Sequence, residues 1–234
     1  MKHTEVDILA FGAHPDDVEI GVGGVLAKHS QAGFVTAICN LTEAELSSNG
    51  TVETRRKEAS RAAEILGVKE LINLKLPDRS IRNVPHQVER LTQMIRRYRP
   101  KVVLAPYFED RHPDHVTCSQ MVDEAVFDAA IRKQRTSGGE AAHRVKHVFY
   151  YFINDIKPAD LIIDISDVYE QKTKAILAYE TQFKREAGEV ETPLNGSTYL
   201  SMMRGRDQLW GNQIQAVYGE GLKTRKPLTS SFLV

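Results

Sequence analysis

Short apolar segments rich in β-branched residues alternate with longer amphipathic segments along the first part of the chain. Gly33, Gly67 and Pro100 each follow a longer segment, and these residue types commonly end helices. Four strand–helix units in succession predict a parallel sheet covered on both faces. We therefore expect an α/β fold: a Rossmann-like, doubly wound, mainly parallel sheet with helices on both faces. The strand-like segments are residues 6–11, 35–41, 71–76 and 102–106, and the helix-like segments are residues 21–32, 51–66, 84–98 and 113–133.

The pattern is weaker after the fourth unit. Two apolar runs, residues 145–153 and 161–165, are expected to extend the sheet, and residues 168–184 have a helical pattern. Residues 199–217 also read as a helix, although glycines obscure its ends. Because the chain has no internal repeat and no low-complexity linker, we expect a single domain over residues 1–234.

The composition limits which classes of partner and which cellular compartment we expect for the protein. The 31 basic and 31 acidic residues give a formal net charge of +0, which argues against a general nucleic-acid binder or a binder of anionic membranes. Cys39 and Cys118 are too few for a disulfide framework or a cysteine-ligated structural zinc site. The apolar run before His14 is too short for a signal peptide or a membrane span. These features predict a soluble cytoplasmic protein without nucleic-acid or membrane partners.

Two polar clusters follow the first and fourth expected strands. The sequence AHPDD occupies residues 13–17, and RHPDH occupies residues 111–115. In the commonest doubly wound strand order, 3-2-1-4-5, the first and fourth strands are neighbours where the winding reverses, and ligands bind beyond their carboxyl ends. Both clusters are therefore expected to face one crevice.

The residue types in these clusters suit a catalytic metal. His14, Asp17 and His115 would supply two imidazoles and one carboxylate, which leaves coordination positions open for chemistry. Zinc would make a bound water ionisable near neutral pH, although iron, cobalt and manganese accept the same donors. Asp16 could act as general base. His112, at the expected N-cap of the following helix, could stabilise a developing oxyanion.

Other interpretations of the same residues stay open. Two histidines and a carboxylate also form the facial triad of non-haem iron oxygenases, and a metal-containing sugar- or nucleotide-binding module would need no catalysis. Asp114 is explained by the helix dipole alone. The glycine-rich residues 21–24 resemble part of a dinucleotide fingerprint, but Leu26 stands where the third glycine belongs, so dinucleotide binding is not expected.

At these residues the sequence resembles the LmbE/PIG-L family of zinc-dependent deacetylases. The matching segments are GAHPDDVEIG (residues 12–21), LTEAELSSNGT (residues 41–51) and APYFEDRHPDH (residues 105–115). The likeness extends over the whole chain and is most secure over residues 6–133.

The resemblance implies one Zn²⁺ per chain, with His14, Asp17 and His115 as ligands, Asp16 as general base and His112 as oxyanion stabiliser. It also implies a small-molecule N-acetylglucosamine conjugate as substrate and a homo-oligomer such as a hexamer. The nearest likeness is to the branch that deacetylates N-acetylglucosaminyl-malate in bacillithiol biosynthesis. A broader N-acetylglucosamine or chito-oligosaccharide deacetylase and an amidase of bacillithiol conjugates are the alternatives.

A malate group would need basic partners. Arg55 is the first choice, because a guanidinium binds carboxylates bidentately and this residue lies near the start of an expected helix. Ser47 and Ser48 could donate hydrogen bonds to sugar hydroxyls. The remaining expected substrate-binding residues are Arg111, Arg144 and Tyr199.

Overall fold

The computed structural model describes residues 5–184, 188 and 190–228. Over these residues the chain forms a seven-stranded sheet in the order β3-β2-β1-β4-β5-β7-β6. The strands are β1 (Ile8–Gly12), β2 (Thr36–Thr42), β3 (Glu70–Leu76), β4 (Val102–Pro106), β5 (His147–Tyr151), β6 (Leu161–Asp164) and β7 (Gly219–Lys223). The helices are α1 (Asp17–Gln31), α2 (Val52–Leu66), α3 (Pro85–Tyr98), α4 (Pro113–Ala129), α5 (Tyr169–Leu177), α6 (Glu180–Phe183) and α7 (Tyr199–Gln213).

The predicted strand order at the centre of the sheet is confirmed. β1 pairs in parallel with β2 on one side and with β4 on the other, so the winding reverses between β1 and β4. β3 and β5 continue the parallel part outward. β7 pairs antiparallel with both β5 and β6, which makes the sheet mixed at this edge.

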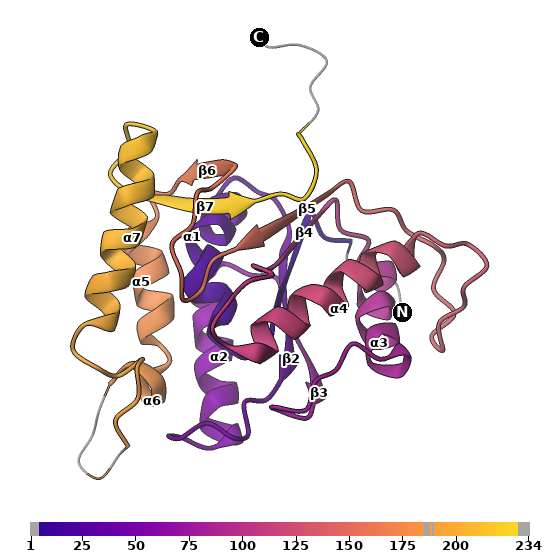
Figure 1. Ribbon diagram of the computed structural model, residues 1–234, viewed down its shortest axis with the longest axis horizontal. Helices are drawn as coiled ribbons and strands as arrows, with labels where there is room; N and C mark the ends of the chain where they lie inside the picture. Colours follow the sequence, from indigo (N-terminus) through magenta and orange to yellow (C-terminus); the bar gives the residue numbers. More distant parts are fainter. Residues whose placement is uncertain (1–4, 185–187, 189, 229–234) are drawn as a thin grey trace.

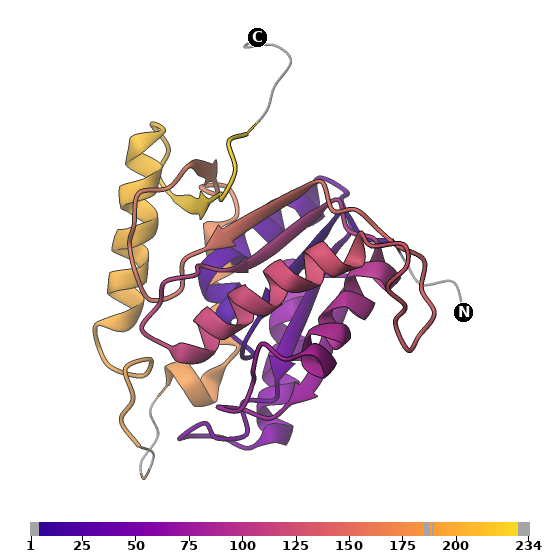
Figure 2. The same ribbon diagram turned by 45° about the vertical axis from the view of Figure 1, so that its right-hand side comes forward.

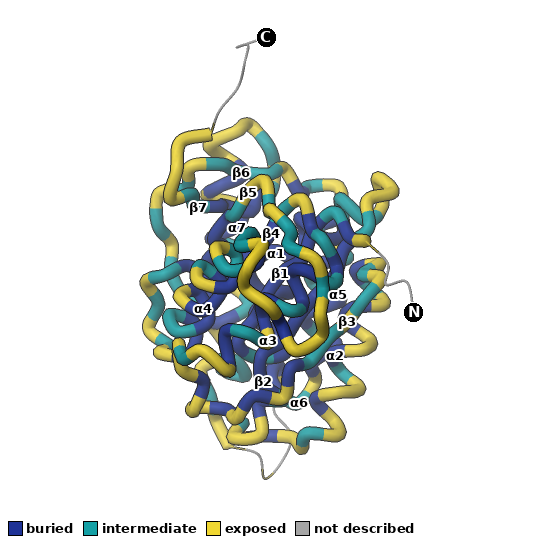
Figure 3. The backbone as a smooth tube through the Cα atoms, turned by 90° about the vertical axis from the view of Figure 1, so that its right-hand side faces the viewer, coloured by how far each residue is buried: buried dark blue, intermediate teal, exposed yellow. Residues whose placement is uncertain are grey.

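Helices cover both faces of the sheet (Figures 1 and 2). One apolar core lies between the sheet and α3 with α4, and a second lies between the sheet and α1, α2 and α5. Every residue of β1 and β2 is buried, as expected for parallel strands covered on two faces. Figure 3 shows the same pattern, with buried backbone at the centre and exposed loops around it.

Local sequence signals determine where α2, the helix that carries Arg55, begins and ends. The Thr51 side chain accepts a hydrogen bond from the backbone N–H of Thr54, and the Thr54 hydroxyl bonds back to the N–H of Thr51. This capping box satisfies donors that a helix start leaves free. Gly67 ends α2 with φ 71°, a left-handed conformation that glycine adopts without strain.

The helix α1 is broken near its first turn. Val22 has φ −142° and ψ 22°, which is not helical. The glycines on either side allow close packing, because a Cβ on Gly21 would lie 2.1 Å from the Tyr151 ring and one on Gly24 would lie 2.8 Å from Ile165. The glycine-rich run that resembled a nucleotide motif is therefore explained by packing.

Several expected boundaries in the second half are wrong. The run at residues 168–184 is two helices, α5 and α6, and α7 ends at Gln213 instead of residue 217. The helix expected to reach residue 133 ends at Ala129, where Arg96 donates hydrogen bonds to the carbonyls of Asp128 and Ala129. β7 was not expected at all. No helix within the described residues has the length and apolar character needed to cross a bilayer.

Candidate active site

The two polar clusters meet at the carboxyl ends of β1 and β4, as the strand order predicted. They lie in a cavity of about 430 Å³ whose walls also include the loop at residues 44–48, the loop at residues 192–194, and α7 through Tyr199. A short loop joins β1 to α1 and another joins β4 to α4, so each cluster lies in such a loop and at the helix start that follows it.

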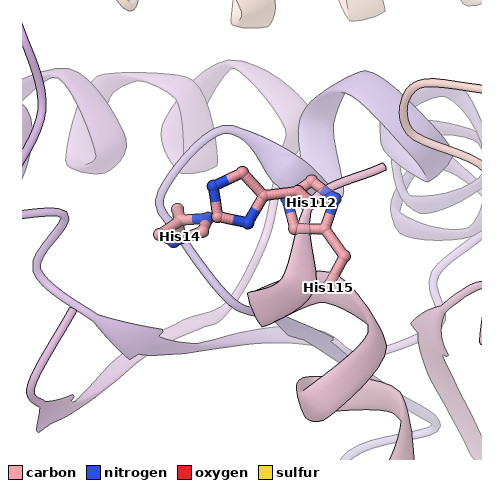
Figure 4. A group of neighbouring side chains, drawn as sticks. All are labelled: His14, His112 and His115. Carbon is pink, nitrogen blue, oxygen red and sulfur yellow. The ribbon is translucent and has the colours of Figure 1, made fainter. Parts of the chain in front are cut away.

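Three imidazoles gather in this cavity (Figure 4). His14 follows β1, whereas His112 and His115 come from the start of α4. One ring nitrogen from each lies within 4.8 Å of the others. The ring centroids of His14 and His115 are 5.6 Å apart, and those of His112 and His115 are 4.7 Å apart.

The Asp17 carboxylate lies between two of these rings. Its Oδ1 is 3.1 Å from His115 Nε2, and its Oδ2 is 3.5 Å from His14 Nδ1. Asp17 Oδ2 also accepts a hydrogen bond of 2.9 Å from the backbone N–H of His14, which holds the carboxylate in place. Two imidazole nitrogens and one carboxylate therefore converge, and this donor set suits zinc and related divalent cations.

The outer nitrogen of His115 is held by a carboxylate. His115 Nδ1 lies 3.0 Å from Asp110 Oδ1, which also accepts hydrogen bonds from Asn154 Nδ2 and from the backbone N–H of His112. With the proton on Nδ1, the lone pair of His115 Nε2 points toward Asp17. Carboxylates commonly orient metal-binding histidines in this way.

His14 has an equivalent arrangement. Its Nε2 lies 3.2 Å from Asp78 Oδ1 and 3.5 Å from Asp114 Oδ2. These three residues also form a group that could hold a cation. However, Arg79 binds Asp114 through its backbone N–H at 3.0 Å and its Nη1 at 2.7 Å, and Asp78 Oδ2 accepts from the N–H of Leu46. Both carboxylates are thus engaged as outer partners of His14, which leaves His14 Nδ1 facing Asp17.

The histidines and carboxylates of this cluster shift each other's pKa values toward the charged forms. Burial alone would lower the pKa of His115, but the nearby Asp17 and Asp110 raise that pKa to about 9. Burial opposes protonation of His14 as well, yet the carboxylates around it raise the pKa of His14 well above its usual range. Burial would raise the pKa of Asp17, but His115 and His14 hold it well below its usual range. A divalent cation would displace the imidazole protons and pair with the same carboxylate.

Asp16 occupies a strained position beside this cluster. It is the N-cap of α1 with φ 110°, a backbone conformation that costs energy for a residue with a side chain. Arg55 Nη2 donates to Asp16 Oδ2 at 3.2 Å and also to the carbonyl oxygen of Pro15. Burial raises the pKa of Asp16 to about 6, although the Arg55 charge opposes this shift. A carboxylate with this pKa can accept a proton near neutral pH.

His112 is the N-cap of α4, as expected from Pro113 at the first helical position. Its Nδ1 accepts a hydrogen bond of 3.2 Å from the backbone N–H of Asp114. Burial and the charges of His115 and His14 lower the pKa of His112 to about 4. His112 is therefore neutral at pH 7, with its proton on Nε2, where it can donate a hydrogen bond.

The expected substrate-binding residues divide into two groups. Ser47, Ser48, Arg55, Arg111 and Tyr199 line the cavity. Arg144 does not: it precedes β5 and lines a separate cavity of about 650 Å³ beside the end of α4 and the segment after β7. Arg144 was expected in the site, but the structure places it at a different surface.

Arg55 is more buried than its expected role requires. It is only 2% exposed, and its closest partners are Asp16 and Pro15. Within the part of the chain that the structure describes, Arg55 Nε and Nη1 have no hydrogen-bond partner, and neither does Tyr199 Oη. Arg55 thus has a position beside the expected general base that the sequence reasoning missed.

Four further residues around the histidines were also missed: Asp78, Arg79, Asp110 and Asn154. Asp78 and Arg79 follow β3, Asp110 follows β4, and Asn154 follows β5. All of them lie beyond the carboxyl ends of parallel strands, which is the signal that identified the two histidine clusters. Asp114, which was explained by the helix dipole alone, also contacts His14.

Known proteins are similar to this chain in sequence and in fold. The family PIG-L, described as GlcNAc-PI de-N-acetylase, matches residues 9–126. Diacetylchitobiose deacetylase of Thermococcus kodakarensis is 31% identical over 199 residues, which cover 80% of this chain and 73% of the relative. A probable N-acetyl-alpha-D-glucosaminyl L-malate deacetylase 2 of Bacillus anthracis is 24% identical over 90% of this chain and 96% of its own length. The crystal structure of the conserved protein TT1542 from Thermus thermophilus has a TM-score of 0.88 and 35% identity, covering 98% of this chain and 99% of that one. The chain therefore belongs to the PIG-L family of deacetylases.

Proposed function

We propose that this protein is a metal-dependent N-deacetylase that acts on N-acetylglucosamine saccharides of the chitobiose type. The observation that carries the proposal is the convergence of His14, Asp17 and His115 beside Asp16 and His112 in one cavity. The cavity volume of about 430 Å³ lies in the range of small-molecule sites.

His14 Nδ1, His115 Nε2 and an Asp17 oxygen are the atoms that would hold the metal. A bound zinc ion would polarise the acetamide carbonyl and make a water ionisable near neutral pH. The outer carboxylates Asp78 and Asp110 keep the two imidazoles oriented toward this point. The buried surroundings strengthen every electrostatic interaction in the site.

The remaining steps belong to the side chains. Asp16 accepts a proton as the water oxygen attacks the acetamide carbon. The Nε2–H of His112 donates to the carbonyl oxygen as negative charge develops there, which is commonly the largest single contribution in acyl transfer. The C–N bond then breaks, and the leaving amine takes a proton from Asp16 or His112. The products are acetate and the saccharide with a free amino group in place of the acetamide.

The proposed substrate is that of the broader chito-oligosaccharide deacetylase, which was an alternative in the sequence analysis. The relative that acts on diacetylchitobiose is 31% identical, whereas the relative named for the malate conjugate is 24% identical. The malate conjugate stays a second candidate because Arg111 lines the cavity and is exposed to solvent, where it could meet a carboxylate.

The test is amine release by the purified protein from N,N′-diacetylchitobiose, N-acetylglucosamine and N-acetylglucosaminyl-malate, each with zinc and after chelation. Chelator-sensitive release that favours the disaccharide supports the proposal. A strong preference for the malate conjugate would transfer the assignment to bacillithiol biosynthesis. If no amine is released from any of them by folded, zinc-loaded protein, the deacetylase proposal is wrong.

A further inference from the structure

The break in α1 is occupied by side chains from two distant elements. In an unbroken helix the N–H of Gly24 would donate to the carbonyl of Ile20. Here the N–H groups of Gly24 and Val25 donate instead to the two carboxylate oxygens of Glu220, at 2.9 and 2.6 Å. The freed carbonyl of Ile20 accepts a hydrogen bond of 2.8 Å from Arg206 Nη2.

Arg206 and Glu220 belong to a buried cluster of balanced charge. Lys172 Nζ lies 2.6 Å from Asp207 Oδ2 and 2.8 Å from Glu220 Oε1, and Arg206 Nε lies 3.2 Å from Asp207 Oδ1. All four side chains are buried. Well-packed apolar residues can often replace a buried charged cluster without loss of stability. Stability alone therefore explains poorly why this chain has such a cluster.

Arg206 joins two segments that lead to the candidate metal ligands. Its Nη1 donates to the carbonyls of Phe152 and Ile153, at 3.1 and 2.9 Å, directly before Asn154. Its Nη2 bonds Ile20, which lies in the first turn of α1, three residues after Asp17.

The connection continues into the site on both sides. Asn154 donates to Asp110 Oδ1 at 2.9 Å, and the same oxygen holds His115 Nδ1 at 3.0 Å. Asp17 begins the short helical piece that ends at the break. A single guanidinium thus bonds the first turn of α1, which carries Asp17, and the backbone next to Asn154, whose side chain holds the Asp110 partner of His115.

We infer that Arg206 is a positioning residue that sets the spacing between Asp17 and His115 by bonding the Ile20 and Phe152–Ile153 carbonyls from inside the α1 break. This inference rests on the proposed metal site. The guanidinium donors of Arg206 form a planar fork that reaches separate acceptors. A lysine ammonium cannot reproduce this geometry. Arg206→Lys keeps the charge beside Asp207 and loses the bracing.

Arg96→Lys is the matched control. Arg96 is also buried, and it donates to the carbonyls of Asp128, Ala129, Ile131 and Gln134. These acceptors lie at the C-terminal end of the 17-residue α4 or just beyond it, whereas His112 lies at its N-terminal end. Both variants lose carbonyl hydrogen bonds, but only Arg206→Lys loses them beside the site.

The decisive readout is the zinc dissociation constant of folded protein, measured by competition with a chromogenic chelator. Loss of a group that orients metal ligands commonly weakens metal binding by about 10–100-fold, and we expect a change of that size for Arg206→Lys. Arg96→Lys should bind zinc as the natural protein does, although both variants should melt at lower temperature. The visible spectrum of the cobalt-substituted protein should change only in Arg206→Lys.

Two outcomes would overturn the inference. In the first, the natural protein binds zinc and releases amine, but folded Arg206→Lys binds zinc with unchanged affinity; the proposed function then survives and the positioning role does not. In the second, the natural protein binds no metal, and both proposals fall together. If Arg206→Lys does not fold, the charge-balanced double variant Arg206→Gln/Asp207→Asn is measured instead, and the same two results decide.

Discussion

The packing of the glycines in α1 makes a quantitative prediction for Gly21→Ala. The added Cβ would lie 2.1 Å from Cδ2 and 2.8 Å from Cε2 of the Tyr151 ring. Tyr151 is fully buried, and its hydroxyl donates to the carbonyl of Phe11 at 2.7 Å. The added atom therefore clashes with a buried ring, and moving this ring would disturb a buried hydrogen bond.

The expected loss can be estimated from these contacts. Overpacking at a buried site costs up to about 3 kcal/mol, and loss of the Tyr151 hydrogen bond costs about 1 kcal/mol. Alanine recovers about 1 kcal/mol through its greater helix propensity. The net destabilisation of about 3 kcal/mol corresponds to a fall in Tm of about 6–12 °C for a chain of this size.

Gly23→Ala provides the matched control. A Cβ at Gly23 would lie 3.4 Å from Lys172 Cγ, which is an ordinary contact. The stability of Gly23→Ala should therefore stay within about 1 kcal/mol of the natural chain. Thermal unfolding followed by far-UV circular dichroism measures both variants. Equal melting temperatures for Gly21→Ala and Gly23→Ala would refute the packing explanation.

Three further predictions concern the site. Asp16→Asn should keep zinc and lower kcat by about 10²–10⁴-fold; substantial residual turnover in steady-state assays would remove the general-base role. Asp110→Ala should weaken zinc binding by about 10–100-fold, because the His115 ring loses its orienting carboxylate; chelator competition would reveal an unchanged affinity if that reasoning is wrong. Arg55→Ala should lower kcat for neutral and acidic substrates alike, because Arg55 contacts Asp16; a KM increase confined to the malate conjugate would restore the expected carboxylate-binding role.

The parallel half of the fold was predictable because its signals are local. The strands up to β4 are short apolar runs, and the helices between them end near glycine or before proline, so the element order indicated a doubly wound sheet. The strand order 3-2-1-4-5 was expected because it is the commonest in such sheets, and the structure has it. The site followed from the same order, since residues after β1 and β4 must meet where the winding reverses.

β7 was missed because its sequence lacks the usual pattern. Gly219–Lys223 reads GEGLK, with two glycines and two charged residues, which disfavours a strand. The glycines are needed for contact: a Cβ at Gly221 would lie 2.6 Å from the Trp210 ring. The buried Glu220 serves the α1 break. These residues are required by tertiary contacts, so the sequence of β7 shows no strand periodicity.

The role of Arg55 was also hidden from the sequence. Its place near the start of α2 suggested contact with a substrate anion, but the fold brings Asp16, thirty-nine residues earlier, against its guanidinium. The position of Arg144 differs from the expected one for a related reason. It depends on the path of the loop before β5, and the sequence contains no signal for that path. Long-range pairings of charged side chains require the three-dimensional structure.

The central claim is that His14, Asp17 and His115 hold a metal required for deacetylation. Its most direct test measures bound zinc and amine release from N,N′-diacetylchitobiose in parallel, for the natural protein, Asp17→Ala and His112→Ala. We predict one zinc per natural chain, activity that is lost on chelation and returns in proportion to zinc, loss of zinc in Asp17→Ala, and retained zinc with low turnover in His112→Ala. Full activity in folded, metal-free natural protein would contradict the account.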